Sequence, residues 1–214
     1  MGRSSCRSRS SAGRSGVAGT HYWHRSALAA LHLRQGNLDA YQKICRQLVA
    51  EIHTTSDDDC LADLVRLACL SPVGVDDYAP IREISNTLMA KRENEFFQRN
   101  QTSVLCRLKL WKEAVEALRA YRTKYQGGLG LAQPMLFQAI AFHHVGEIDA
   151  ARELLIEARV YAEAQSPDPK DPVDWFSFDA IYTEIEFAEA SKLILGEPQE
   201  LSLKHPDPDV EAPK

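Results

Sequence analysis

The chain has 214 residues, of which 44% are hydrophobic and 26% charged, a composition typical of a soluble globular domain. No apolar run approaches the roughly 20 residues that a membrane-spanning helix needs, so we expect no membrane anchor. The net charge of -5 is unevenly placed, because the first nineteen residues hold four arginines and no acid; the acidic remainder argues against nucleic-acid binding by the folded body.

Residues 1–19 are predicted to form a disordered basic arm rich in Arg and Ser. They lack the apolar stretch of a secretory signal. Such an arm suits phosphorylation or a weak contact with nucleic acid, and it is equally what a truncated start would look like. The five cysteines are Cys6, Cys45, Cys60, Cys69 and Cys106, with no CxxC pair. We expect unpaired thiols and a cytoplasmic protein.

From Thr20 onward apolar residues recur at helical spacing, with almost no strand pattern. The first predicted helix is 22–34, and it stops at Gly36, which can adopt the left-handed conformation that ends a helix. A second helix is predicted over 39–53. A tight glycine turn between two amphipathic helices predicts an antiparallel helical hairpin.

The same pattern returns three times. Asp57 to Asp59 supply a cap for a helix that Ser71-Pro72-Val73-Gly74 ends, and a helix with Pro80 in its first turn follows. The third hairpin is predicted over 96–108 and 111–125, and the fourth over 134–145 and 148–164. The corresponding positions Tyr41, Tyr78, Ala114 and Ala151 are separated by 37, 36 and 37 residues, a fixed period that predicts a stacked repeat.

A proline-rich break precedes one more predicted helix, 173–195. We interpret it as a capping helix, whose polar outer face stops further stacking. The predicted organisation is therefore a repeat domain over 20–195, with units near 20–55, 57–92, 94–126 and 131–165, and the cap at 173–195. The tail, 196–214, is acidic and proline-rich and is predicted to be disordered.

Two segments resemble the turn and second helix of a tetratricopeptide repeat. They are Gly146-Glu-Ile-Asp-Ala-Ala-Arg-Glu-Leu-Leu-Ile-Glu-Ala158 and Leu110-Trp-Lys-Glu-Ala-Val-Glu-Ala-Leu118, although Lys109 stands where glycine is usual. The segments at 23–33, 40–48 and 68–72 further resemble the C-terminal repeat regions of large bacterial serine/threonine protein kinases and WD-repeat proteins. The resemblance implies an all-α, TPR-like superhelix of about four hairpins plus a capping helix, acting in protein binding.

The sequence predicts no enzyme, no cofactor and no metal site. His21 and His24, and likewise His143 and His144, lack the further ligands that a metal needs. The glycine cluster 127–130 lacks the strand and Lys-Ser or Lys-Thr of a phosphate loop. Kinase catalytic motifs are also missing. Acidic residues also recur in the last predicted helix, at Asp179, Glu184, Glu186 and Glu189. They could form a carboxylate pair for catalysis, but we interpret them as a solvated helix face.

The first helices of such hairpins line a concave groove that receives a peptide or partner helix. We therefore predict binding of another protein or peptide there, with an acidic segment gripped by Arg34, Arg99 and Arg107. The alternatives are a detached regulatory region of a bacterial serine/threonine kinase and an unrecognised enzyme. The resemblance implies partner-binding residues Trp23, Arg34, Phe96, Arg99, Arg107, Gln133 and His143. The resemblance also places Ser26, Ala30, Ser103, Leu136 and Ile140 on this concave face.

Overall fold

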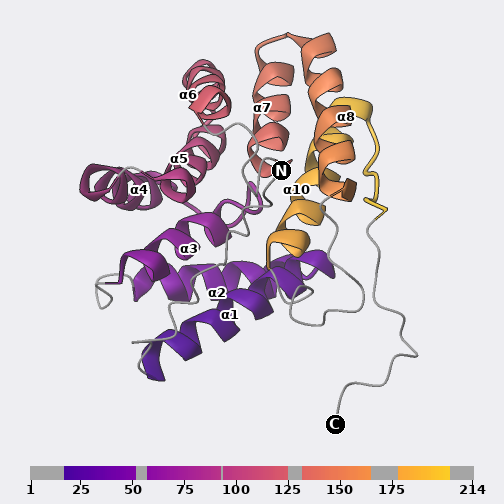
Figure 1. Ribbon diagram of the computed structural model, residues 1–214. Coiled ribbons are helices and arrows are strands. Elements are labelled where there is room, and N and C mark those ends of the chain that lie inside the picture. Colours follow the sequence, from indigo (N-terminus) through magenta and orange to yellow (C-terminus); the bar gives the residue numbers. More distant parts are fainter. Residues whose placement is uncertain (1–16, 52–56, 93, 125–131, 165–177, 203–214) are drawn as a thin grey trace, which may run out of the picture.

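The computed structural model describes residues 17–51, 57–92, 94–124, 132–164 and 178–202. All regular structure in these residues is α-helical (Figure 1). The helices are α1 (Val17–Arg34), α2 (Leu38–Ala50), α3 (Asp58–Ala68), α4 (Ala79–Lys91), α5 (Glu95–Arg107), α6 (Trp111–Lys124), α7 (Ala132–His144), α8 (Ile148–Ala164) and α10 (Phe178–Leu195). None of these helices is long and apolar enough to cross a bilayer.

The helix ends follow the predicted signals. Gly36 and Gly146 have positive φ, at 75° and 86°, where each hairpin turns. Lys109 takes the same left-handed conformation, with φ 60°, in place of a glycine. Asp57 caps α3 by accepting hydrogen bonds from the amides of Asp59 and Cys60, and Pro80 lies in the first turn of α4. The predicted hairpin turns are therefore confirmed.

The contacts between helices are those of a stacked TPR-like superhelix, as predicted. Consecutive helices pair as α1–α2, α3–α4, α5–α6 and α7–α8, and the second helix of each pair also packs on the first helix of the next. The first helices touch one another in the order α1, α3, α5, α7. They form a common surface, called the inner face below.

The first two units have a tyrosine at the position where the last two have a small residue. Ala114 and Ala151 are fully buried where helices meet, whereas the first two units have Tyr41 and Tyr78 there, both buried. The Tyr41 hydroxyl donates to the carbonyl of Leu67 at 2.7 Å. The single proton of the Tyr78 hydroxyl is shared between the carbonyls of α3 residue Ala68, at 3.0 Å, and of Ser71, at 2.7 Å. The two hydroxyl groups therefore supply hydrogen-bond donors to carbonyl groups at the end of α3, which an alanine at either position could not do.

Two predicted boundaries differ from the structure. α1 begins at Val17 rather than Tyr22, so only residues 1–16 of the predicted arm lie outside the described residues. The predicted start of the last helix, 173–177, also lies outside them. The tail was predicted to be disordered from Gly196, but residues 197–202 fold back on α8 and α10. Leu201 is buried there, and the amide of Ser202 donates to the Glu163 carboxylate.

α10 does more than cap the last hairpin. It packs against α7 and α8 through Phe187, Ala190 and Ile194, as a capping helix should, but it also contacts α1 at the other end of the array. Figure 1 shows α10 extending from beside α8 towards α1 and α2. Tyr182, near its start, belongs to the core of the first two hairpins. α10 therefore lies across the inner face and connects both ends of the superhelix.

Candidate protein-binding face

Charged side chains join α10 to the inner face. We call this set the arginine–glutamate seam: Arg34 of α1, Arg66 of α3, Arg99 and Arg107 of α5, and Glu184, Glu186 and Glu189 of α10. Arg34 meets Glu184, and Arg107 meets Glu189. At 3.6 residues per turn, Glu186 and Glu189 lie roughly 60° apart around α10, whereas Glu184 lies roughly 160° from Glu186, so the arginines meet α10 on more than one side. The seam is the place where an acidic helix contacts the predicted basic groove.

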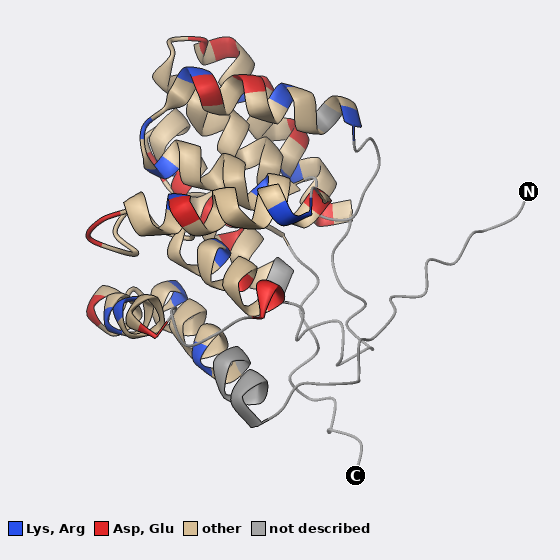
Figure 2. Cartoon of the chain, turned by 90° about the vertical axis from the view of Figure 1, so that its left-hand side faces the viewer, with Lys and Arg blue, Asp and Glu red and all other residues tan. Residues whose placement is uncertain are grey.

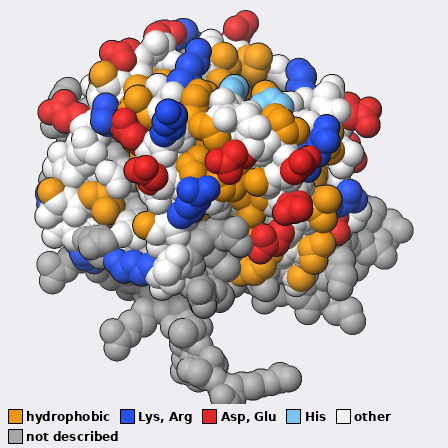
Figure 3. Space-filling view, turned by 90° about the horizontal axis from the view of Figure 1, so that it is seen from above, with side chains coloured by type: hydrophobic (Ala, Val, Ile, Leu, Met, Phe, Trp, Pro, Cys, Tyr) orange, Lys and Arg blue, Asp and Glu red, His pale blue; other side chains and the backbone are white. Residues whose placement is uncertain are grey.

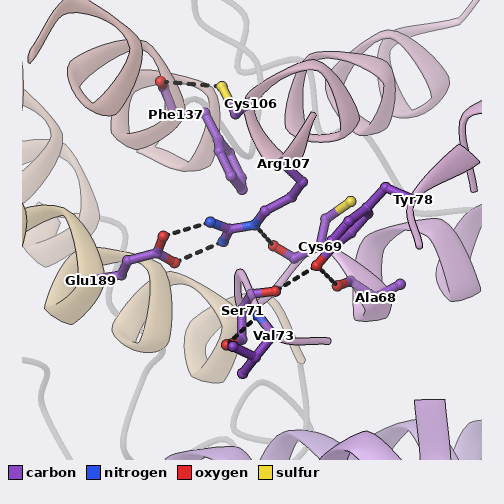
Figure 4. Close-up of polar contacts among 9 residues, drawn as sticks. All are labelled: Ala68, Cys69, Ser71, Val73, Tyr78, Cys106, Arg107, Phe137 and Glu189. Atoms are coloured by element: carbon purple, nitrogen blue, oxygen red, sulfur yellow. Dashed lines mark hydrogen bonds and ion pairs between the residues drawn. The ribbon is translucent and has the colours of Figure 1, made fainter. Parts of the chain in front are cut away.

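Arg107 is the most extensively bound member of the seam (Figure 4). Its guanidinium donates to both carboxylate oxygens of Glu189, at 2.5 and 2.7 Å, and its Nε donates to the carbonyl of Cys69 at 2.8 Å. The guanidinium also lies 5.3 Å from the ring centroid of Phe137. Its side chain is only 4% exposed, and Glu189 raises its pKa against the effect of burial. Arg107 therefore links α3, α5, α7 and α10.

The other seam contacts follow the length of α10. Arg34 forms an ion pair with Glu184 at 3.1 Å, with the arginine side chain about half exposed. Arg66 stacks over the ring of Tyr182, 4.3 Å from its centroid, and donates to the side-chain oxygen of Gln133 at 3.0 Å. Cations therefore face α10 from its first turns to its middle.

Glu186 is the buried centre of the seam. Its side chain is buried, and burial raises its pKa to about 7, although the charges of Arg66, Arg107 and Arg99 act in the opposite direction. The acids of this helix were predicted to be a solvated face, and for Glu186 that prediction is wrong. The reason is that α10 turns this side towards the arginines rather than towards solvent.

Protonation of Glu186 should make stability depend on pH. Because the folded-state pKa is raised from 4.5 to about 7, its contribution to stability is complete below about pH 4.5 and is lost as the pH rises through 7. This corresponds to on the order of 3 kcal/mol. We expect Glu186→Gln to remove that loss. The free energy of unfolding of both proteins is measured with urea at about pH 5 and pH 8, so that titration of other acids cancels in the comparison. If the native protein and the variant differ by the same free energy at both pH values, the assignment to Glu186 is contradicted.

The structure brings some of the predicted partner-binding residues together and leaves others apart. Arg34, Arg107 and Gln133 meet α10 or its immediate neighbours. Arg99 is nearly buried, with its guanidinium 5.1 Å from the ring centroid of Phe96 at the start of α5. His143 lies at the end of α7, edge-on to the ring of His144. Trp23 lies in α1, but its side chain is outside the described part of the chain.

Three functional candidates were missed from the sequence: Arg66, Tyr182 and the inward role of Glu186. A signal for Arg66 does exist, because it interrupts the apolar run Leu64-Val65-Arg66-Leu67-Ala68. A charge at such a position needs a buried partner. No comparable local signal marks Tyr182.

A half-open cavity of about 610 Å³ adjoins the seam. Its wall is formed by the end of α1, the α3–α4 turn, α10 and the segment after α10. The lining combines charged groups of both signs, Arg34, Lys192, Glu184, Glu189 and Glu200, with apolar side chains: Leu33, Leu70, Pro72, Ile185, Ala188, Pro198 and Leu201. The volume is in the range of sites that hold a small ligand or part of a peptide.

The four cysteine thiols in the described residues are poorly suited to act as nucleophiles. Burial raises the pKa of Cys45 to about 12, of Cys60 to about 11 and of Cys106 to about 12, and it raises that of Cys69 further. All four thiols are free and buried. Buried neutral thiols are poor nucleophiles. No cluster of three or more metal-ligating side chains occurs in the part of the chain that the structure describes.

The outer surfaces carry mixed charge. Figure 2 shows acidic and basic residues interspersed along the described helices, without the single-sign stripe typical of nucleic-acid binding in this view. Figure 3 shows exposed hydrophobic side chains among charged ones on the face seen from above. Among the exposed apolar side chains are Ile156 and Val160 of α8, which are 64% and 63% exposed. Scattered exposed apolar residues of this kind are ordinary and define no site.

The contacts described above define the class of protein, an all-α array of TPR-like helical hairpins. No protein-family model matches the chain, and no curated protein matches its sequence. A solved structure described as "MamA RS-1 ArsTM double mutant" is similar, with 14% sequence identity and a TM-score of 0.38, over 82% of this chain and 95% of that chain. The assignment of fold rests on the packing of this chain.

Proposed function

We propose that this protein is a non-catalytic interaction module that holds a helical segment of another protein against its inner face. One observation carries the proposal: the inner face already holds a helix, α10, through ion pairs and stacked side chains. Binding an amphipathic helix in a groove between helices is a common mode of recognition. A surface that docks one helix through α1, α3, α5 and α7 is chemically suited to dock another.

The titratable groups support binding rather than catalysis. Glu186 has a pKa near neutrality, which a general acid would need, but its burial leaves it no access to a substrate. The four described thiols are buried and protonated, as above. Free cysteines of this kind also suit a reducing compartment, so we infer a cytoplasmic location.

A partner segment would enter at the cavity beside α10. That opening combines apolar side chains with charged groups of both signs, among them the exposed Arg34, Lys192 and Glu200. Apolar anchors set in a charged rim are the usual anatomy of a protein interface. The cavity therefore gives an outside chain its access to the inner face.

Site-specific photo-crosslinking tests the proposal in cells. A photoreactive phenylalanine analogue replaces Lys192 at the cavity rim, and in a matched protein it replaces Glu153, which is exposed on α8 away from the cavity lining. We expect a discrete crosslinked species from position 192 and none from position 153, with the partner identified by mass spectrometry. Crosslinks from position 153 alone would move the interaction to the outer surface and end the proposal.

A further inference from the structure

The contact between α10 and the inner face has two chemically different parts. Towards its C-terminus, α10 packs through Phe187, Ala190 and Ile194 into the apolar core of the last hairpins. Towards its N-terminus, α10 meets α1, α3 and α5 through the arginine–glutamate seam, and Ile181, Tyr182 and Ile185 also pack on the apolar core of the first hairpins. The first part anchors α10, and the second sets where the helix lies.

Buried ion pairs contribute less to stability than their number suggests. Removing charges from water costs several kcal/mol per ion, roughly what the pairing returns, and apolar replacements are often equally stable. Such pairs do discriminate between partners, because a wrong partner leaves an arginine buried without its carboxylate. The seam is thus better suited to selecting a helix than to holding the fold together.

The spacing of the carboxylates describes what the inner face selects. Glu184 lies opposite Arg34, Glu189 lies opposite Arg107, and Glu186 lies between them among the remaining arginines. On a helix, residues five apart are separated by about 7.5 Å along the axis. The inner face therefore matches a helix that carries charged carboxylates at positions i and i+5, whereas at position i+2 burial raises the pKa of Glu186 and favours its neutral form.

We propose that α10 is a built-in occupant of the partner site and that the partner is an acidic amphipathic helix with this same carboxylate spacing. This inference rests on the proposed function and names its ligand. The partner helix competes with α10 for Arg34, Arg66 and Arg107. Because α10 is tethered, its effective concentration is on the order of millimolar, so it weakens binding of any outside helix.

The test uses the full chain and a labelled synthetic peptide of residues 178–195. Fluorescence anisotropy compares the native protein with Glu184→Gln/Glu189→Gln, which removes two carboxylates from α10 and leaves the arginines in place. We expect the variant to bind the peptide at least about tenfold more tightly. A peptide with glutamine at all three glutamate positions should bind the variant at least about tenfold more weakly than the acidic peptide.

Controls separate folding from competition. Glu147→Gln removes an acid from the exposed Arg119–Glu147 pair and should leave peptide affinity as in the native protein. Circular dichroism checks the helix content of each variant. If the double variant does not fold, Glu184→Gln alone opens the partly exposed Arg34 pair and should still raise peptide affinity, by about threefold.

The outcomes distinguish this inference from the proposed function. Equal peptide affinity for the native and glutamine variants would overturn α10 as the competing occupant. Equal affinity for the acidic and glutamine peptides would overturn the acidic ligand, while leaving the inner face as a helix-binding surface. A crosslinked partner at position 192, together with no binding of either peptide, would refute the inference and keep the proposed function.

Discussion

Replacing Arg107 by alanine should lower the free energy of unfolding by about 3–5 kcal/mol, because it leaves charges and a carbonyl buried without their partner. Glu189 would lose both hydrogen bonds from the guanidinium, and the carbonyl of Cys69 would lose its donor. Glu186 would also lose one of the cations that lower its pKa. Urea unfolding followed by circular dichroism measures the loss.

The matched control is Arg46→Ala. Arg46 also forms two hydrogen bonds with one carboxylate, that of Asp76, but both side chains are more than half exposed. An ion pair of the same geometry that is exposed to water should contribute little to the free energy of unfolding, so the unfolding midpoint of Arg46→Ala should stay close to that of the native protein. Arg107→Met/Glu189→Leu should recover much of the stability lost in Arg107→Ala. A loss from Arg107→Ala as small as that from Arg46→Ala would mean that burial does not govern this pair.

Gly74→Ala is expected to destabilise the protein by roughly 3 kcal/mol, the upper end of the usual cost of overpacking. A Cβ atom at position 74 would lie 2.1 Å from the carbonyl oxygen of Ala68 and 2.8 Å from the Tyr41 hydroxyl. The nearer neighbour is backbone at the end of α3 and cannot rotate away. Thermal and urea unfolding of the variant would measure the effect.

Gly36→Ala separates crowding from backbone conformation. Gly36 has φ 75°, but no atom lies within 4 Å of a Cβ added there. The cost should therefore be only the left-handed conformation of a non-glycine residue, roughly 1 kcal/mol. If Gly36→Ala proved as damaging as Gly74→Ala, close packing of the α3–α4 turn would not be what requires glycine at position 74.

The hairpins could be predicted because their signals are local. Helical spacing, the capping aspartate at 57 and the glycines at 36 and 146 each act within one or two turns of chain. Fixed separations between Tyr41, Tyr78, Ala114 and Ala151 then indicate stacking without any knowledge of contacts. These features are sufficient for the all-α, TPR-like superhelix. Association with a kinase has no such physical correlate and stays a prediction.

The position of α10 could not be predicted, because it depends on contacts between distant residues. Arg107 and Glu189 are 82 residues apart, and Glu184 meets an arginine in the first helix. On a single helix, acids at 184, 186 and 189 have the same pattern whether they face water or arginines. Arginines at the inward positions 34, 99 and 107 were predicted, but the acidic helix that meets them belongs to the same chain.

The contact between α10 and α1 changes how the repeats depend on one another. In an open array each unit touches only its neighbours, so the end units can fray while the middle stays folded. Here the last helix touches the first, and loss of either end removes support from the other. Contacts between residues far apart in sequence also slow folding. The protein should therefore lose its structure as one cooperative unit, unlike a linear stack that melts from its ends.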